Sequence, residues 1–373
     1  MPGIYIHIPF CKQKCTYCDF HFSTTFSTYR GQMIDAILQE IKLRKGYLKA
    51  PISTIYFGGG TPSLLTEIEL NLILTKTKDT FEVLDDTEVT LEANPDDITK
   101  EQLAVWKKAG INRLSIGLQS FKESDLKWMN RAHTVEEANE CISLAQEAGF
   151  HNLTVDLIYG LPDLTLEEWK GHIQQLINKD VPHISAYCLT VEKNTALSNW
   201  VNKGKIKMAS EDVQSEQFLA LLELLEKNGY EQYEISNFCK KGLESKHNSN
   251  YWKGEHYIGI GPSAHSFNGT TRSWNVANNR KYIKAIESNQ GLSEKEELSK
   301  QDQFNELILT GLRTKYGVNL ANLQEILPLS KQFNETFAEF QEKKWVRVKD
   351  NVALLTKSGK LMADYIASEL FVV

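Results

Sequence analysis

The sequence predicts an α/β protein built as a partial (β/α)6 TIM-like barrel, followed by a small winged-helix-like α+β domain at the C-terminal end. Short apolar runs alternate with polar segments in which apolar residues recur every three or four positions, and this alternation is typical of parallel βαβ units. Six such units fit into roughly the first 200 residues, which is too few for a full eightfold barrel. On pattern alone, a doubly wound parallel sheet is the alternative.

The apolar runs give the expected strands in order. They cover residues 3–9, 54–57, 88–93, 113–118, 153–158 and 183–189. Helices are expected between them over 29–43, 101–109, 134–148 and 166–178, where the apolar spacing suits one buried helix face. Further along, 211–228 predicts an amphipathic helix and 230–237 a strand. Residues 240–279 are rich in Gly, Asn, Ser, His and aromatic side chains, so we expect a long ordered loop or a functional segment there.

The end of the chain predicts a further domain. Helices return from residue 300, and 344–355 is typical of a hairpin that turns at Asp350 and Asn351. We therefore expect three parts: the barrel over 1–230, a mixed connecting segment over 231–299 and the C-terminal domain over 300–373. Because the chain carries a net charge of −6, we expect this last domain to pack or to dock a partner, not to read DNA.

Composition limits the classes of function. The 373 residues contain no apolar run long enough for a transmembrane segment, and Met1 leads directly into the first strand without the pattern of a signal peptide. Three cysteines, Cys141, Cys188 and Cys239, are scattered without the spacing of a disulfide framework. We therefore expect a cytoplasmic protein, and we do not expect nucleic acid as its main partner.

The other three cysteines, Cys11, Cys15 and Cys18, lie together near the start of the chain, and no fourth follows nearby. Three thiolates can hold three irons of a [4Fe–4S] cluster and leave the fourth iron open to another ligand, whereas a closed cluster uses four cysteines. A zinc ion bound by these thiolates with His7 or His21 is the alternative.

Unusual residues follow several of the expected strands. The turn Gly58-Gly-Gly60, Glu92, Gln119 and Asp156 all fall at or just after a strand's C-terminal end, where parallel α/β folds bind ligands. Glycines let the backbone approach a ligand closely. Glu92 could accept hydrogen bonds from an ammonium or from ribose hydroxyls, although an N-cap or a surface ion pair is the plainer interpretation.

The three-cysteine motif closely resembles that of the radical S-adenosylmethionine superfamily. There the methionine moiety chelates the open iron, and an electron from the cluster cleaves the sulfonium to give a 5′-deoxyadenosyl radical. Essentially the whole chain resembles one family within it, the anaerobic coproporphyrinogen III oxidase-like proteins. Position by position, this resemblance assigns S-adenosylmethionine binding to Tyr5, Gly59, Gly60, Thr61, Glu92, Gln119, Arg131 and Asp156.

Two branches of that family differ in ways that the sequence can show. The oxidase carries a further cysteine two positions after the third, and a long N-terminal extension that helps to hold its substrate. Here Phe20 stands at the cysteine position and the first strand begins at residue 3. His265 stands where an aliphatic residue is expected in the oxidase. These departures resemble the haem-chaperone branch.

A second motif, His247-Asn-Ser-Asn-Tyr251-Trp252, resembles the HNxxYW motif associated with haem binding in the chaperone branch. A neutral imidazole is a good axial ligand of haem iron, and Tyr251 and Trp252 offer flat apolar faces to a porphyrin. Without the resemblance, a loop histidine is more often a hydrogen-bonded structural residue. Three nearby residues compete for the axial role: His256, His265 and Cys239.

The sequence therefore favours a haem chaperone that carries a [4Fe–4S] cluster and S-adenosylmethionine. Its expected cargo is haem, and its expected partners are haem-accepting proteins such as respiratory enzymes, including acceptors at the membrane. The alternative is the oxygen-independent coproporphyrinogen III oxidase, a radical decarboxylase. A zinc-stabilised scaffold without a redox role is a third hypothesis.

Overall fold

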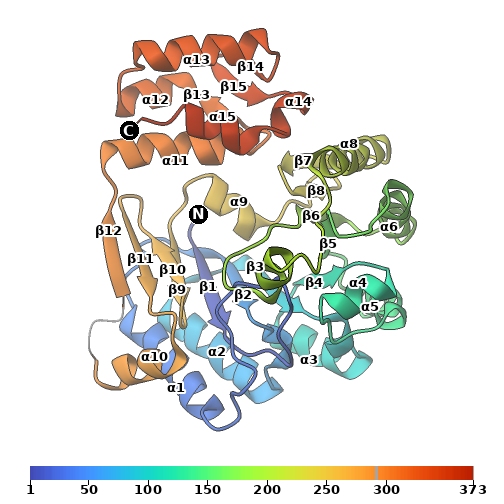
Figure 1. Ribbon diagram of the computed structural model, residues 1–373. Helices are drawn as coiled ribbons and strands as arrows, with labels where there is room; N and C mark the ends of the chain where they lie inside the picture. The colour runs from blue at the N-terminus through green and yellow to red at the C-terminus, as the bar shows by residue number, and fades with distance from the viewer. Residues whose placement is uncertain (290–292, 373) are drawn as a thin grey trace.

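The computed structural model describes residues 1–289 and 293–372, and six parallel strands in sequential order form its centre. These strands are β1 (Gly3–Ile8), β2 (Ile52–Gly59), β3 (Val83–Ala93), β4 (Arg113–Gln119), β5 (Leu153–Tyr159) and β6 (His183–Cys188). Each pairs in parallel with the next. They curve into a half barrel with helices on the outside (Figure 1), so the predicted partial (β/α)6 barrel is confirmed.

The helices of the half barrel connect one strand to the next. They are α1 (Arg30–Leu43), α2 (Glu67–Thr80), α3 (Lys100–Ala109), α4 (Glu123–Trp128), α5 (Val135–Glu147), α6 (Leu166–Asn178), α7 (Ala196–Asn202) and α8 (Glu211–Lys227), with short 3₁₀ turns η1 (Pro62–Leu64) and η2 (Pro95–Asp97). Thr66, Thr134 and Thr165 each begin a helix with a capping box, in which a glutamate three residues on returns the hydrogen bond.

Each barrel strand alternates between an apolar outer face and a polar inner face. The outward residues pack under the helices, and they include Ile4, Ile6, Ile55, Phe57, Val89, Leu91, Leu114, Ile116, Val155, Leu157 and Ile184. Between them lie Thr54, Tyr56, Glu88, Thr90, Glu92, Arg113, Ser115, Thr154, Asp156, His183 and Ser185. Strands of parallel sheets are usually apolar on both faces, so a polar interior indicates a barrel that holds a polar ligand and not a packed core.

The segment 231–299 extends the barrel sheet at both edges. On one side lie β7 (Glu231–Glu234) and β8 (Asn237–Cys239), and on the other β9 (Tyr257–Ile260), β10 (His265–Phe267), β11 (Thr271–Asn275) and β12 (Ser293–Glu297), with helices α9 (Lys246–Trp252) and α10 (Asn279–Glu287). The strand order is β12-β11-β10-β9-β1-β2-β3-β4-β5-β6-β8-β7.

Two predictions for this segment are wrong. The long loop expected over 240–279 contains α9 and three strands, because short strands with glycine and serine turns give too little periodicity to be recognised. The single strand expected over 230–237 ends at Glu234, as β7. A second strand, β8, begins at Asn237 and pairs with β7 in antiparallel fashion. The chain turns between them where the carboxylate of Glu234 accepts a hydrogen bond from the backbone N–H of Ser236 at 2.9 Å.

The C-terminal unit consists of helices around a small antiparallel sheet, above the barrel in Figure 1. Its elements are α11 (Lys300–Leu312), β13 (Val318–Asn319), α12 (Leu320–Ile326), α13 (Lys331–Glu342), β14 (Val346–Lys349), β15 (Val352–Leu355), α14 (Lys357–Lys360) and α15 (Ala363–Glu369). Asp350 and Asn351 have φ angles of 50° and 62°, which suit a type I′ turn and confirm the predicted hairpin. The limits of the three expected domains stay predictions.

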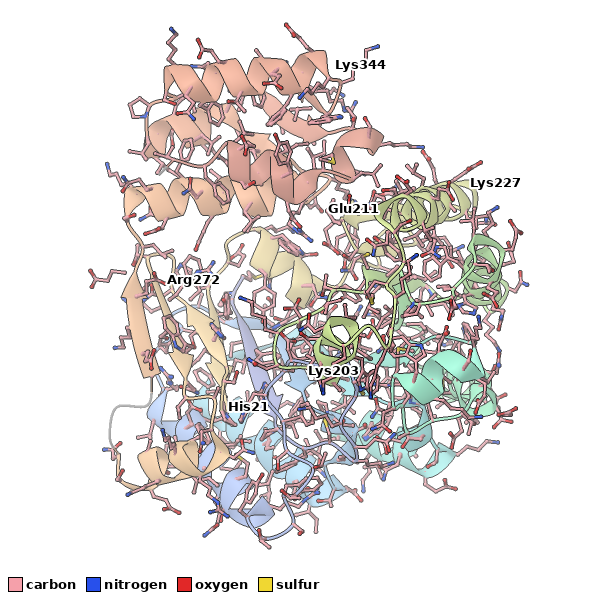
Figure 2. All side chains as sticks on the ribbon, viewed as in Figure 1. His21, Lys203, Glu211, Lys227, Arg272 and Lys344 are labelled. Atoms are coloured by element: carbon pink, nitrogen blue, oxygen red, sulfur yellow. The ribbon has the colours of Figure 1, made fainter. Side chains whose placement is uncertain are left out.

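Ionic and backbone contacts join this unit to the barrel sheet. Arg272, labelled just below α11 in Figure 2, lies 2.8 Å from the carboxylate of Glu306 on α11. The backbone N–H of Ile235 donates to the carbonyl of Arg313 at 2.9 Å. In the described ranges 1–289 and 293–372, no helix combines the length and apolar character needed to cross a membrane.

A fully buried glutamate fastens α1 to the β9–β11 side of the sheet. Glu40 accepts hydrogen bonds from the side chains of Asn275 and Tyr282 and from the backbone N–H of Gly261, at 2.7–2.8 Å. Arg44, one turn on, lies 3.2 Å from the same carboxylate. A buried charge with this many donors stabilises the fold because each donor would otherwise lack a partner.

We expect Glu40→Ala to lower the free energy of unfolding by about 3 kcal/mol, because it leaves buried donors and an arginine unpaired. Chemical denaturation of the ligand-free protein measures this change. Glu287→Ala on the exposed end of α10 is the matched control and should stay within about 0.5 kcal/mol of the wild type. Equal stability of the two variants would contradict the role assigned to Glu40.

Candidate functional site

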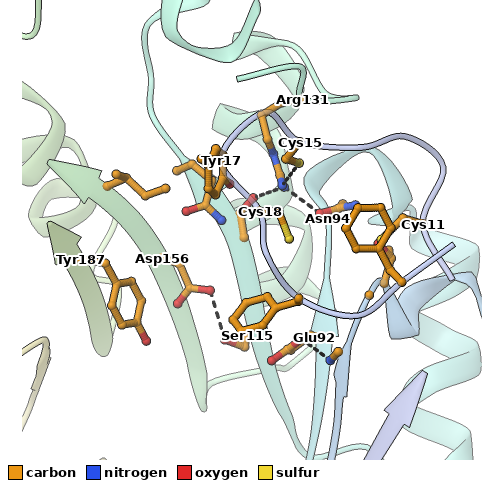
Figure 3. Close-up of a pocket in the computed structure, with 18 of the residues that line it drawn as sticks. Cys11, Cys15, Tyr17, Cys18, Glu92, Asn94, Ser115, Arg131, Asp156 and Tyr187 are labelled. Carbon is orange, nitrogen blue, oxygen red and sulfur yellow. Dashed lines mark hydrogen bonds between the residues drawn. The ribbon is translucent and has the colours of Figure 1, made fainter. Parts of the chain in front are cut away.

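One cavity of about 520 Å³ opens at the C-terminal ends of the barrel strands. Figure 3 shows its lining: the cysteine loop on one side, Glu92 and Ser115 on β3 and β4, and Asp156 and Tyr187 on the opposite side. Ten of the predicted site residues line it: Cys11, Cys15, Cys18, Gly59, Gly60, Thr61, Glu92, Gln119, Arg131 and Asp156. Residues from six separate strands and loops thus meet around one space.

The cysteine loop is held against the segment that follows α4. The side chain of Gln13 donates to the carbonyl of Asn130 at 2.9 Å, and the side chain of Asn130 donates to the carbonyl of Lys14 at 2.7 Å. Lys12 forms ion pairs with Asp96 and Asp97 beyond the end of β3. These contacts fix a loop that has no regular secondary structure of its own.

The thiols of this loop receive hydrogen bonds from cavity residues. The hydroxyl of Thr61 donates to the sulfur of Cys11 at 3.4 Å, and Nη1 of Arg131 donates to the sulfur of Cys15 at 3.3 Å. Burial raises the pKa of Cys11 to about 11 and that of Cys18 to about 12. Thiols of high pKa ionise when a metal binds, and the donors would then stabilise the charge on sulfur.

The donor set fits an iron–sulfur cluster better than a single ion. Over residues 1–289 and 293–372, no three Cys, His, Asp or Glu side chains come close enough together to hold one metal ion. In a cluster each thiolate binds a different iron, so the sulfurs lie further apart than around zinc. Neither alternative zinc ligand lines the cavity: Nε2 of His7 lies 2.7 Å from the carbonyl of His21, and Nε2 of His21 lies 2.7 Å from Oδ1 of Asn279.

The glycine turn after β2 brings the backbone next to the cysteine loop. Gly59 has a φ of 111°, a conformation that side chains other than glycine rarely adopt. A Cβ atom at Gly60 would lie 2.6 Å from the carbonyl oxygen of Phe10. Both glycines are therefore required by the geometry, and both line the cavity.

Two carboxylates face the cavity without a basic partner in the part of the chain that the structure describes. The hydroxyl of Tyr56 donates to Glu92 at 2.8 Å and the backbone N–H of Gly59 donates to it at 3.2 Å. Burial, with a contribution from Asp156, raises the pKa of Glu92 to about 7. Burial also raises the pKa of Asp156 to about 6. Two such acids make the cavity a good site for a cationic ligand.

The other three predicted residues, Gln119, Arg131 and Tyr5, differ in their position relative to the cavity. Gln119 ends β4 with a φ of 71°, a strained conformation that is common at functional sites. Arg131 uses Nη2 to bind the amide oxygen of Asn94 and the carbonyl of Gly117, at 2.7 and 2.6 Å. Tyr5 lies deeper in the barrel and is absent from the described lining, with its ring stacked on that of Tyr56 at 6.1 Å.

The prediction that Asp156 lies at a strand end is wrong, because it is the fourth residue of the seven in β5. It reaches the cavity because its side chain points inward. The sequence analysis also missed several lining residues: Tyr56, Asn94, Ser115, Thr154, Ser185 and Tyr187. All but Asn94 lie on strands, and their polar positions alternate with apolar ones, which was the available signal.

His247 lies on α9 and is buried, with 2% of its surface exposed. Its Nδ1 lies 2.8 Å from the hydroxyl of Thr54 and its Nε2 lies 2.9 Å from the hydroxyl of Tyr251. Burial lowers the pKa of His247 to about 3. Each ring nitrogen of His247 thus has a hydroxyl partner, Thr54 for Nδ1 and Tyr251 for Nε2. The indole of Trp252 lies under the guanidinium of Arg313, 5.7 Å from ring centroid to Cζ.

The competing candidates differ in accessibility. Cys239 is fully buried, whereas His256 and His265 are exposed. His265 stacks on the indole of Trp274 at 5.9 Å. Among the described residues, no hydrogen bond involves the ring of either exposed histidine.

Comparison with known proteins shows which proteins this chain resembles. The sequence model of the radical SAM superfamily matches residues 5–176. The "Heme chaperone HemW" of Bacillus subtilis is 34% identical over 369 residues, which cover 98% of this chain and 97% of that protein. The protein of the same name from Lactococcus lactis is 38% identical over 84% of this chain and 82% of its own, and that of Escherichia coli is 37% identical over 70% and 69%.

Among solved structures, the coproporphyrinogen III oxidase HemN of Escherichia coli has a similar fold. The TM-score is 0.85, with 21% sequence identity over 99% of this chain and 90% of that one. At this identity the likeness shows the fold alone.

The first test of the site concerns its three thiols. After anaerobic reconstitution, we expect about four irons and four sulfides per chain. Cys11→Ala, Cys15→Ala or Cys18→Ala should each abolish the cluster, because each thiol would bind its own iron. Iron and sulfide analysis with visible absorption measures this. Cys141→Ala is the control, because that thiol is buried in α5 and donates to the carbonyl of Ala138. A protein that takes up zinc but no iron would contradict the assignment.

Proposed function

We propose that this chain, which belongs to the HemW family of the radical SAM superfamily, is a haem chaperone that binds haem and passes it to acceptor proteins. The observation that carries the proposal is the likeness to relatives named haem chaperones along nearly the whole of both chains. That range includes the cysteine loop, the HNxxYW segment and the C-terminal unit, so each part of the chain has a counterpart in those proteins.

Membership of the radical SAM superfamily implies a [4Fe–4S] cluster and S-adenosylmethionine, and we assign both to the cavity. The three cysteines of the loop would hold the cluster. Glu92 would accept hydrogen bonds from the ammonium group of the methionine moiety, and the backbone at Gly59 and Gly60 would lie along that moiety. Asp156 would accept hydrogen bonds from the ribose hydroxyls. When bound, the cluster supplies an iron with an open coordination position and an electron.

The two carboxylates support this assignment. S-adenosylmethionine carries positive charge at its sulfonium and its amino group. Two buried acids that form no ion pair among the described residues gain most from such a ligand. Gln119 and Thr61 add donors and acceptors for its uncharged groups.

Phe20 favours the chaperone over the oxidase. Its ring is 70% exposed and lines the cavity next to Cys18. It presents a flat apolar face where the oxidase branch carries a thiol, and such a face suits a porphyrin better than it suits polar chemistry on propionates. The acceptors we propose are haem proteins such as respiratory enzymes, reached from the cytoplasm and in some cases at the membrane.

For the cargo, we expect the cluster-loaded protein to bind haem at about one per chain, and to show no decarboxylation of coproporphyrinogen III when S-adenosylmethionine and a reductant are supplied. Titration followed by the Soret band measures the first, and product analysis the second. Sustained decarboxylation would overturn the proposal in favour of the oxidase. His256→Ala and His265→Ala, tested singly and together, show whether an exposed imidazole binds the iron.

For the cofactor, we expect the affinity for S-adenosylmethionine to rise about five- to tenfold from about pH 6 to about pH 7.5. Glu92 has a pKa of about 7 in the ligand-free protein, so it is largely neutral at the lower pH and ionised at the higher one. Only the ionised carboxylate pairs with an ammonium. Asp156, with a pKa of about 6, adds to the loss at low pH.

Equilibrium dialysis at each pH measures this dependence on cluster-loaded protein. Glu92→Gln should bind about ten- to hundredfold more weakly, as expected for the loss of a charged hydrogen bond, and its affinity should vary less with pH. If wild type and Glu92→Gln share one pH profile, Glu92 is not the group that recognises the ammonium.

A further inference from the structure

We infer that the HNxxYW segment on α9 forms the floor of the cofactor cavity, and that His247 and Tyr56 are positioning residues that hold Glu92 in place. The inference rests on the proposed binding of S-adenosylmethionine at Glu92. It assigns His247 to the architecture of the site and not to the iron of haem.

The first step is the attachment of α9 to the barrel strands. The two carboxylate oxygens of Glu88 on β3 accept hydrogen bonds from the backbone N–H groups of His247 and Lys246, at 3.0 and 3.1 Å. Asn248, the next residue, lines the cavity itself. The helix therefore closes the half barrel near the N-terminal ends of its strands, opposite the cysteine loop.

The second step is the environment of the imidazole. Thr54 on β2 and Tyr251 on α9 bind its two nitrogens. A Cβ atom added at Gly3 would lie 3.1 Å from Nδ1 of His247, so β1 packs closely against the ring. An axial ligand needs a free nitrogen and open space for a porphyrin, and this position offers neither.

The third step connects the imidazole to the carboxylate. The ring of His247 stacks on the ring of Tyr56, with centroids 4.9 Å apart and planes 24° apart. The hydroxyl of that tyrosine donates to Glu92 at 2.8 Å. The ring of Tyr5 packs on both of these rings, with its centroid 6.1 Å from that of Tyr56 and 6.5 Å from that of His247. Because aromatic rings packed on one another restrict rotation, the stack fixes where the hydroxyl points.

Glu92 is then held from two sides. Tyr56 donates to one oxygen, and the backbone N–H of Gly59, in the glycine turn, donates to the other. A carboxylate fixed in this way is preorganised for a ligand and loses little conformational freedom on binding. Loss of the stack should therefore weaken binding of S-adenosylmethionine although neither ring needs to touch it.

The test uses cluster-loaded protein, with the dissociation constant of S-adenosylmethionine from equilibrium dialysis as its readout. We expect Tyr56→Phe, which keeps the ring and removes the hydroxyl, to bind about tenfold more weakly. His247→Leu should show a loss of similar size, and His247→Gln, which can still bond to Thr54 and Tyr251, should recover part of it. The double variant His247→Leu/Tyr56→Phe should lose less than the product of the two, because both act through Glu92.

Stability and haem spectra separate this role from the alternatives. Glu40→Ala is the control for destabilisation away from the cavity: it should unfold more easily while its dissociation constant stays within about twofold of wild type. With haem added, His247→Leu should keep the Soret band of the wild type, because another group binds the iron.

Any of the following three results would overturn the inference. If His247→Leu changes the haem spectrum but leaves S-adenosylmethionine affinity and unfolding unchanged, His247 is the axial ligand. If wild type binds S-adenosylmethionine and both Tyr56→Phe and His247→Leu bind it equally well, only this inference fails. If the wild type itself binds none, the cofactor assignment of the proposed function fails with it.

Discussion

The structure depends on one constraint: the polar side chains that point into the half barrel must find their partners there. At its base Arg113 lies 3.9 Å from Glu88 and hydrogen bonds to Thr154, which in turn bonds to His183. Buried polar groups without partners are costly, so this network sets the positions of the strands. Towards the strand ends the inward carboxylates of Glu92 and Asp156 accept hydrogen bonds but form no ion pair among the described residues, and there the cavity begins.

The fold follows from the sequence to the extent that its signals are periodic. Apolar outward residues such as Ile4, Ile55 and Leu114 mark the strands, and apolar residues every three or four positions mark the helices, so the six βα units could be predicted. The edge strands β9–β11 could not, because three to five residues with glycine turns carry no clear period. Asp156 was found through resemblance and placed at the wrong point of its strand, since a parallel strand with a polar inner face is uncommon.

The residues of the site also fall into those that the sequence could predict and those that it could not. A spacing of three thiols is a local pattern, so Cys11, Cys15 and Cys18 could be recognised directly. The roles of Tyr56 and His247 could not be recognised, because they depend on β2 and α9 lying side by side. These two elements are far apart in the chain: the contacting residues Thr54 and His247 are separated by 193 positions. On our inference, a motif associated with haem binding thus serves the architecture of the cofactor cavity.

We propose that three thiolates hold a cluster whose remaining iron takes a ligand fixed by Glu92. Mössbauer spectroscopy of ⁵⁷Fe-reconstituted protein tests it most directly, with and without S-adenosylmethionine. We expect that one iron of the cluster, and only one, changes its isomer shift when S-adenosylmethionine is added, and that the change is much reduced in Glu92→Gln. A cluster whose irons all keep their parameters when S-adenosylmethionine is added in excess would contradict it.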